Sequence, residues 1–223
     1  MSHEGNPTTA GRVVRAGASA LGTALAAATR SVAAARPAAK PLHPIGVLVN
    51  GTLQRHGSPV PSGSAWVDQA GADDVVVRIS RAIGLPVTVP DIHGLAVRVL
   101  TPEAGGDLLF ASTGWGRLGR FVLTFVGGPA SRPMTTLLPY RTSSGAVLLG
   151  ARATDPRTYE LSWSRPLGEW QPFAELRLTG DEAPDQAISF DPVRNQLPGL
   201  AQYPLVVRLR EPAYLTARRS RRH

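Results

Sequence analysis

Two residues near the end of the sequence have the types and spacing of a metal-cofactor ligand and its partner. Arg210 and Tyr214 stand four positions apart, so a guanidinium could lie beside the phenol oxygen on one helical face. A phenolate is one of the few protein ligands for ferric haem iron. Because an ordinary tyrosine has a pKa near 10, holding the anion at pH 7 requires roughly 4 kcal/mol from the iron and the arginine together. The pair is therefore a candidate haem ligand.

The run of arginines after this tyrosine allows more than one interpretation. Arg218, Arg219, Arg221 and Arg222 follow within a few residues. Arginine pairs well with carboxylates and phosphates, so the run suits the two carboxylates of haem. It also suits a solvated basic tail or a surface for polyanions.

Composition narrows the class of protein. The 223 residues carry a formal charge of +8 and include no cysteine. The missing cysteines exclude a disulfide framework, a thiolate zinc site and a cysteine nucleophile. The basic charge would attract polyanions, but the sequence has neither a recognisable DNA-binding helix motif nor basic residues interleaved with exposed aromatics. We therefore expect no nucleic-acid partner.

The first 40 residues differ from the rest. Residues 11–39 are rich in alanine, with arginines spaced through them. Gly17 and Ser19 interrupt the continuous apolar core that a secretory signal needs, and the segment is too polar to span a bilayer. We interpret residues 1–40 as an arm that packs on the domain or on a partner subunit, with an amphipathic membrane-surface helix as the alternative. Residues 41–223 would form one domain, without a transmembrane segment, of a cytoplasmic protein.

From residue 41 onward the sequence is typical of strands separated by turns. Apolar runs and period-two alternation recur between clusters of glycine and proline. The predicted strands cover residues 45–54, 74–81, 94–101, 107–112, 134–141, 145–153, 158–164 and 172–179. We therefore expect a mainly β (α+β) fold in which eight antiparallel strands close into a barrel, with an N-terminal arm and a short C-terminal helix that carries Tyr214. Residues 113–126 could form a capping helix or one more strand, since their periodicity does not decide.

Further candidate residues lie where strands begin. His43 precedes the first strand among apolar neighbours that would draw it inward, and burial would keep its imidazole neutral and able to take a proton. A histidine at such a place can equally be structural. Arg78 and Ser80 are two positions apart on the second strand, so their side chains should share one face.

The order of these segments resembles the catalase superfamily. Catalases begin their barrel with Arg-x-x-His-x-x-Gly, continue with Val-Arg-Phe-Ser and Asp-x-Arg-Gly-x-Ala-Val, reach Asp-Leu-x-x-Asn-Asn-Thr, and end with Arg-x-x-x-Tyr. The corresponding segments here are residues 40–46, 77–80, 91–97, 107–113 and 210–214, and residues 190–192 and 198–200 are similar to the approach to the catalase haem ligand. The resemblance implies a catalase-like barrel with ferric haem b as cofactor.

The resemblance also implies a role for each matching residue. His43 would transfer the proton of bound peroxide, and Ser80 would orient this histidine. Tyr214 would bind the iron, and Arg210 would keep it ionised. The residues that match contacts of the haem propionates are Lys40, Arg78 and Arg221.

Several positions depart from the family pattern. The distal asparagine that polarises peroxide falls at Ala111 or Ser112, so its donor is missing or replaced by a hydroxyl. His93 stands in place of an arginine, and Lys40 offers a point charge in place of a guanidinium fork. Pro212 precedes the tyrosine by two residues and is compatible only with the first turn of a helix. These changes weaken the case for efficient dismutation and for tight haem binding.

Two functional hypotheses follow. The first is a haem-dependent peroxidase or weak catalase that acts on hydrogen peroxide or organic hydroperoxides with an unidentified reductant, hydroperoxide rearrangement being a related outcome. The second is a barrel that has kept the fold without peroxidase activity and binds haem inertly, or another apolar or anionic ligand. The resemblance is compatible with a homodimer or a larger homo-oligomer in either case.

Overall fold

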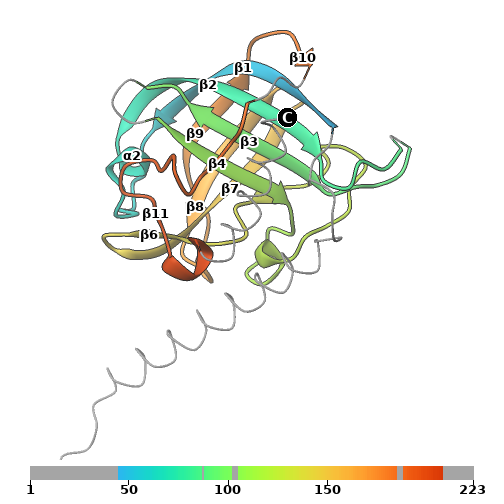
Figure 1. The fold of residues 1–223 in the computed structure, drawn as a ribbon. Coiled ribbons are helices and arrows are strands. Elements are labelled where there is room, and N and C mark those ends of the chain that lie inside the picture. The colour runs from blue at the N-terminus through green and yellow to red at the C-terminus, as the bar shows by residue number, and fades with distance from the viewer. Residues whose placement is uncertain (1–44, 87, 102–104, 185–187, 208–223) are drawn as a thin grey trace, which may run out of the picture.

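Long antiparallel strands make up most of the chain in the computed structural model, which describes residues 45–86, 88–101, 105–184 and 188–207 (Figure 1). The strands are β1 (Ile45–His56), β2 (Ala70–Arg81), β3 (His93–Val99), β4 (Gly106–Ser112), β5 (Met134–Thr135), β6 (Tyr140–Thr142), β7 (Gly145–Asp155), β8 (Thr158–Ser164), β9 (Gln171–Leu178), β10 (Ala183–Pro184) and β11 (Ala201–Gln202). Among the described residues, two short helices accompany them, α2 (Ala65–Asp68) and the 3-10 helix η1 (Gly119–Phe121), and a further helical stretch begins at residue 204.

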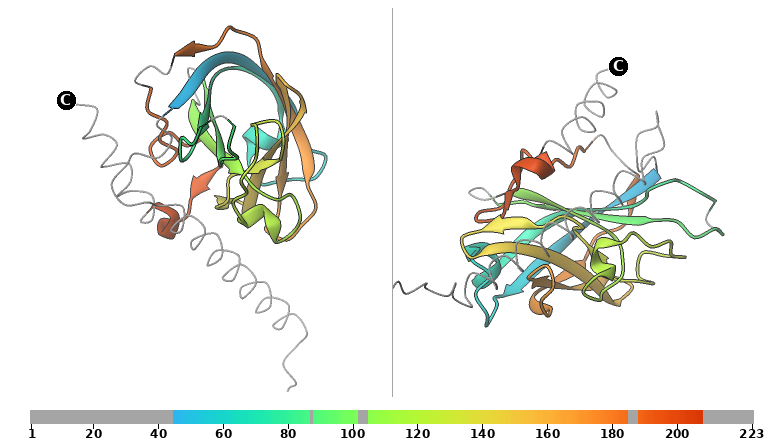
Figure 2. Two further views of the ribbon diagram at one scale, coloured as in Figure 1. Left: turned by 90° about the vertical axis from the view of Figure 1, so that its right-hand side faces the viewer. Right: turned by 90° about the horizontal axis from the view of Figure 1, so that it is seen from below.

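Eight of these strands close into a ring. Their order is β7-β5-β4-β3-β2-β1-β9-β8, and β8 pairs again with β7. Every pairing in the ring is antiparallel, and Figure 2 (left) shows the strands around their common interior. Closure leaves no strand of the ring with an open edge. The predicted eight-stranded antiparallel barrel is therefore confirmed.

Alternation along each strand decides what fills the interior. On β2, Val75 and Val77 are 1% and 0% exposed and belong to the core, whereas Asp74, which alternates with these inward positions, is exposed. Side chains from all the long strands meet inside in this way. Trp66 of α2 joins them and packs edge-on against Phe173 of β9, with ring centroids 5.8 Å apart. The interior of the barrel is thus a packed apolar core, held by hydrophobic burial.

Two predicted segments differ from the observed elements. The strand expected over residues 134–141 is divided into β5, which belongs to the ring, and β6, which pairs with β7 and β11. Leu137 between them has φ +58°, a left-handed conformation that no strand accommodates. Residues 113–126 form neither a full helix nor a strand. They contain η1 and contribute to two isolated bridges, Asp91 with Val126 and Thr113 with Leu123.

An ion pair with a buried carboxylate anchors the segment that follows the barrel strands. Arg98 on β3 donates through Nε and Nη2 to the two carboxylate oxygens of Asp107 on β4, both at 2.7 Å. Asp107 also accepts the backbone N–H of Asp191 at 2.6 Å and the amide of Asn195 at 2.8 Å. A further Nη2 bond from the arginine reaches the carbonyl of Ser189 at 2.6 Å. Residues 189–195 are thereby fixed against the outside of β3 and β4.

The described chain ends just beyond this anchor. β11 pairs with β6, and residues 204–207 are helical, with the N–H of Val207 donating to the carbonyl of Tyr203 at 3.0 Å. The predicted N-terminal arm and the predicted helix around Tyr214 lie outside the described residues. Within the part of the chain that is described, no helix has the length and apolar character needed to cross a membrane.

The buried carboxylate of this ion pair predicts a large effect on stability. Arg98→Met would leave the carboxylate of Asp107 buried without its cation, and we expect the free energy of unfolding to fall by about 3 kcal/mol. The control is Arg177→Met, because Arg177 pairs with Glu175 on the surface, where such a pair contributes little. Urea unfolding followed by circular dichroism measures both. Equal effects of the two substitutions would contradict the anchoring role.

Candidate functional site

The structure describes three of the predicted site residues, Arg78, Ser80 and Ser112. The other five lie outside the described residues and stay predictions: Lys40, His43, Arg210, Tyr214 and Arg221.

Arg78 and Ser80 share one face of β2, as their spacing predicts. Val75 and Val77 on the same strand point into the core, so the alternation of the strand turns both polar side chains to the outside of the barrel. Ser80 is nevertheless 6% exposed, and Arg78 is half-buried. The candidate site is therefore a covered part of the outer barrel surface.

Small residues form a row across this surface. In the strand register, Gly46 of β1 lies opposite Ser80, Ser80 opposite Gly94 of β3, and Gly94 opposite Ala111 of β4. Residues directly opposite one another in antiparallel strands project to the same side. The row carries no side chain larger than the hydroxymethyl group of the serine. The strand backbones are therefore bare of large side chains of their own along this row, although Ala111 at its end packs against the apolar cluster that includes Phe121 and Leu138.

Gly46 also determines where the charge of Arg78 lies. A Cβ atom at Gly46 would stand 2.9 Å from Cζ and Nη2 of Arg78 and 2.9 Å from the carbonyl oxygen of Ile79. The guanidinium therefore rests on the bare backbone of β1, at the first member of the row of small residues. This contact gives a physical reason for the glycine three residues after His43, which also closes the first catalase-like segment.

Ser112 does not join Arg78 and Ser80. Its position on β4 alternates with that of Ala111, and its side chain is fully buried. The hydroxyl oxygen accepts the backbone N–H of His93 at 3.2 Å and donates to the carbonyl of Thr124 at 2.7 Å. Its proton is thus engaged in holding residues 113–126 against the barrel. Ala111 is the member of this pair that lies in the row with Ser80.

His93, which the sequence marked only as a departure from the family pattern, is buried at the end of β3. It is 4% exposed, and its Nε2 atom has no hydrogen-bond partner among the described residues. Burial, followed by the positive charge of Arg81 on the neighbouring strand, lowers the pKa of this imidazole below its ordinary value, against the opposing effect of Asp91. The ring is therefore neutral at pH 7.

Asp91 shapes the loop before this histidine. The carboxylate is fully buried and accepts the backbone N–H groups of Ile83 at 3.1 Å, Gly84 at 2.9 Å, Leu85 at 3.1 Å and Ile92 at 2.7 Å. Burial acts to raise the pKa of Asp91, but these hydrogen bonds outweigh it and the pKa lies below its ordinary value. The aspartate of the third catalase-like segment thus ties residues 83–85 to the start of β3.

Comparison with known proteins bears on the fold. No protein family and no curated protein matches the sequence. Among solved structures, that of a bacterial catalase superposes with a TM-score of 0.58 at 12% sequence identity, over 82% of this chain and 57% of the catalase chain. The fold is a catalase-like barrel. This chain spans little more than half the length of that catalase, and at this identity the likeness concerns the fold alone.

Some of the described polar residues are positioned by local strand alternation, which the sequence shows, and others by contacts between distant segments, which it does not show. Period-two spacing was enough to place Arg78 and Ser80 together. The buried environment of His93 had no clear signal, because it depends on Ser112 and on the distant segment around Val126. Within the described residues, no three His, Asp or Glu side chains gather in a way that could hold a metal ion.

The lowered pKa of His93 predicts a pH-dependent stability. Below about pH 6.5 the unfolded chain takes up a proton at this residue while the folded protein resists it, so the free energy of unfolding should fall as the pH falls. His93→Gln should remove this part of the pH dependence. Urea unfolding at pH 7.5, 6.5 and 5.5 measures the slope, with His56→Gln, at an exposed histidine on β1, as the control. A slope that persists in the His93 variant would contradict the assignment.

Proposed function

We propose that this protein is a haem-dependent peroxidase or weak catalase that acts on hydrogen peroxide or organic hydroperoxides. The observation that carries the proposal is the outer face of β1–β4 in a catalase-like barrel, where Arg78 and Ser80 lie together beside a row of small residues. Four of the catalase-like segments each contribute one described residue to this row: Gly46, Ser80, Gly94 and Ala111.

Two features of the described residues support ferric haem b as the cofactor. The strands from Gly46 to Ala111 carry only small side chains toward a flat macrocycle, and the guanidinium of Arg78, which now lies on Gly46, is suited to a propionate. Lys40 and Arg221 would add positive charge for the same carboxylates. When bound, the haem would supply the oxidative chemistry.

The chain's own residues would supply binding and proton transfer. Tyr214 would bind the iron as a phenolate, and Arg210 would stabilise that charge. His43 would accept the proton from one peroxide oxygen and return it to the other. Ser80 lies opposite Gly46 on the neighbouring strand, and its hydroxyl would orient the imidazole through a hydrogen bond.

Peroxidase chemistry fits this face better than rapid dismutation. Ala111 offers no hydrogen-bond donor at the place where the family pattern has an amide, and the proton of Ser112 is donated to Thr124. The same observation favours the alternative function, a catalase-like barrel that binds haem or another apolar or anionic ligand without turnover.

Replacement of the proposed iron ligand tests the proposal directly. Protein from cells supplied with a haem precursor should show a Soret band with ferric high-spin features, and Tyr214→Phe should lose most of its haem, measured as pyridine haemochromogen. Tyr159→Phe is the matched control, because Tyr159 is buried in the barrel core and its hydroxyl has no partner among the described residues.

Three other results would redirect the proposal. Unchanged haem content in Tyr214→Phe would refute the ligand assignment. A colourless protein that does not bind added hemin would refute the enzyme. Haem-loaded protein that oxidises guaiacol with peroxide no faster than free hemin would establish the inert alternative.

A change beneath Arg78 tests whether haem lies on the outer face. Gly46→Ala should displace the guanidinium and weaken hemin binding about tenfold, as expected for the loss of one charged hydrogen bond. Gly116→Ala is the control, because a Cβ atom there would meet nothing within 4 Å. Hemin titration followed at the Soret band gives both affinities. Equal affinities would place the haem elsewhere.

A further inference from the structure

A pocket lies on different strands from the proposed haem face. It measures about 410 Å³ and lies over β7–β9, closed on one side by residues 115–120. Its lining includes Trp115, Trp170, Arg120, Arg152, Glu160 and Ser162.

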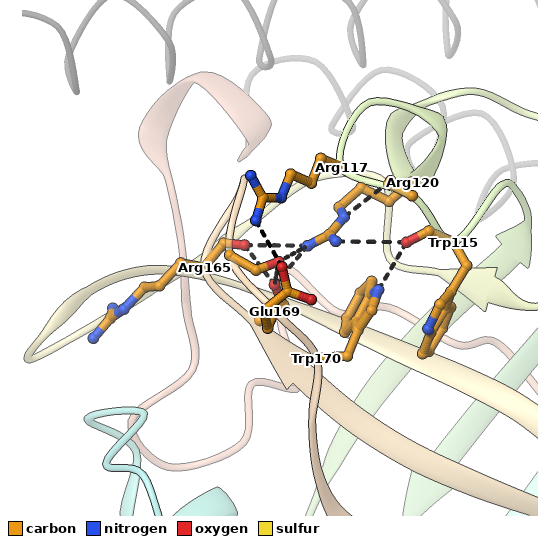
Figure 3. A network of polar contacts seen from close by, with 9 residues as sticks. Trp115, Arg117, Arg120, Arg165, Glu169 and Trp170 are labelled. Atoms are coloured by element: carbon orange, nitrogen blue, oxygen red, sulfur yellow. Dashed lines mark hydrogen bonds and ion pairs between the residues drawn. The ribbon is translucent and has the colours of Figure 1, made fainter.

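Two stacked tryptophans form one wall of the pocket (Figure 3). The rings of Trp115 and Trp170 lie 4.2 Å apart between centroids with their planes 19° from parallel, and the indole N–H of Trp170 donates to the carbonyl of Trp115 at 2.9 Å. A Cβ atom at Gly150 of β7 would stand 2.7 Å from the ring of Trp115 and 3.0 Å from that of Trp170. The glycine therefore lets the indole pair lie directly on the sheet.

Arg120 brings a buried positive charge to this wall. Its side chain is 2% exposed, with the guanidinium carbon 4.4 Å from the ring centroid of Trp170. It donates to neutral acceptors: the hydroxyl of Ser164 at 2.5 Å and the carbonyls of Gly168 at 3.0 Å and Gly116 at 3.2 Å. Among the described residues no carboxylate forms an ion pair with it. These dipoles and the nearby carboxylate of Glu169, which itself pairs with Arg117 at 2.7 Å, offset only part of the cost of burying this charge, and the pKa of Arg120 lies below its ordinary value because burial outweighs them. An anion nearby would therefore stabilise the charge further.

A strand irregularity places an unused hydroxyl in the pocket. The pairing of β8 with β9 shifts register between Leu161 and Ser162, so that Ser162 lies opposite Pro172. Proline has no N–H to donate. Ser162 is 1% exposed, and its Oγ atom has no partner among the described residues. Bulges of this kind often re-aim a side chain beside a functional site.

The rim of the pocket carries an ion pair that is partly exposed to solvent. Nη2 of Arg152 donates to Glu160 at 3.0 Å, and the side chains are 53% and 31% exposed. The guanidinium of Arg152 also lies 5.7 Å from the ring centroid of Trp115. Three arginines and two glutamates line the pocket, which gives it a net charge of +1.

We propose that this pocket binds a small organic anion, a carboxylate carried on an aromatic or other apolar body. The carboxylate pairs with the guanidinium of Arg152 and the hydroxyl of Ser162, close to the charge of Arg120. The apolar body contacts the indole wall. This binding requires no haem.

Isothermal titration calorimetry with the full-length protein tests the ligand class. Benzoate is the main probe, acetate lacks the apolar body, and benzyl alcohol and benzylamine replace the negative charge by a neutral and a positive group. We expect benzoate to bind at least tenfold more tightly than each of the other three. Equal or tighter binding of benzyl alcohol or benzylamine would overturn the proposal.

The two partners of the rim ion pair should act in opposite directions. Arg152→Gln should weaken benzoate binding at least tenfold, whereas Glu160→Gln frees the guanidinium and should strengthen it several-fold. Arg177→Gln and Glu175→Gln are matched controls from a surface pair outside the pocket. Affinities within twofold of the wild type for both rim variants would refute the site.

Ser162→Ala separates binding from folding. The substitution removes a buried hydroxyl that has no partner among the described residues, so the melting temperature should not fall, while benzoate affinity should fall several-fold. A lower melting temperature with unchanged affinity would assign the hydroxyl a structural role and overturn the proposal. A benzoate-induced shift of the Soret band in haem-loaded protein, unaffected by these variants, would place the anion at the haem and overturn it as well.

Discussion

The ion pair between Arg98 and Asp107 is the constraint on which the path of the C-terminal chain depends. An outward-facing carboxylate near the start of a barrel strand would ordinarily be solvated, but here it is buried and bonded to β3, to Asp191 and to Asn195 at once. Because both oxygens are occupied, the segment cannot slide along the barrel without breaking several charged hydrogen bonds. The chain that leads to β11, and in the proposal to Tyr214, therefore leaves the barrel from one defined place.

Both candidate sites lie on the outside of the barrel, since large side chains fill its interior. At each site a glycine stands where the Cβ atom of any other residue would collide with the side chain above the strand. Gly46 allows the guanidinium of Arg78 to rest on β1, and Gly150 allows two indoles to rest on β7. The absence of a Cβ atom thus lets flat cationic or aromatic groups lie against the sheet at two separate places on the outside of the barrel. A flat or anionic ligand could contact them there.

The sequence predicted those parts of the fold that depend on local alternation. The eight ring strands and the common face of Arg78 and Ser80 follow from a period of two, which can be recognised without knowing which strands are paired. Residues 113–126 were ambiguous because distant contacts hold them, among them the bond from Ser112 to Thr124. The pocket was missed for the same reason, since Arg120 finds its partners more than 40 residues away. Pro139, which has no N–H to donate to a strand ladder, marks the break between β5 and β6 in the sequence.

Closure of the ring has a consequence for folding during synthesis. Residues 51–55 of β1 pair with residues 174–178 of β9, so the first strand of the barrel finds its second neighbour only when the last strand of the ring has been made. Contacts this distant along the chain are slow to form, because the loop between them must first lose its conformational freedom. During synthesis the nascent sheet thus carries an unpaired edge on β1 for most of the time that translation takes, and that edge is where misassembly between emerging chains would begin.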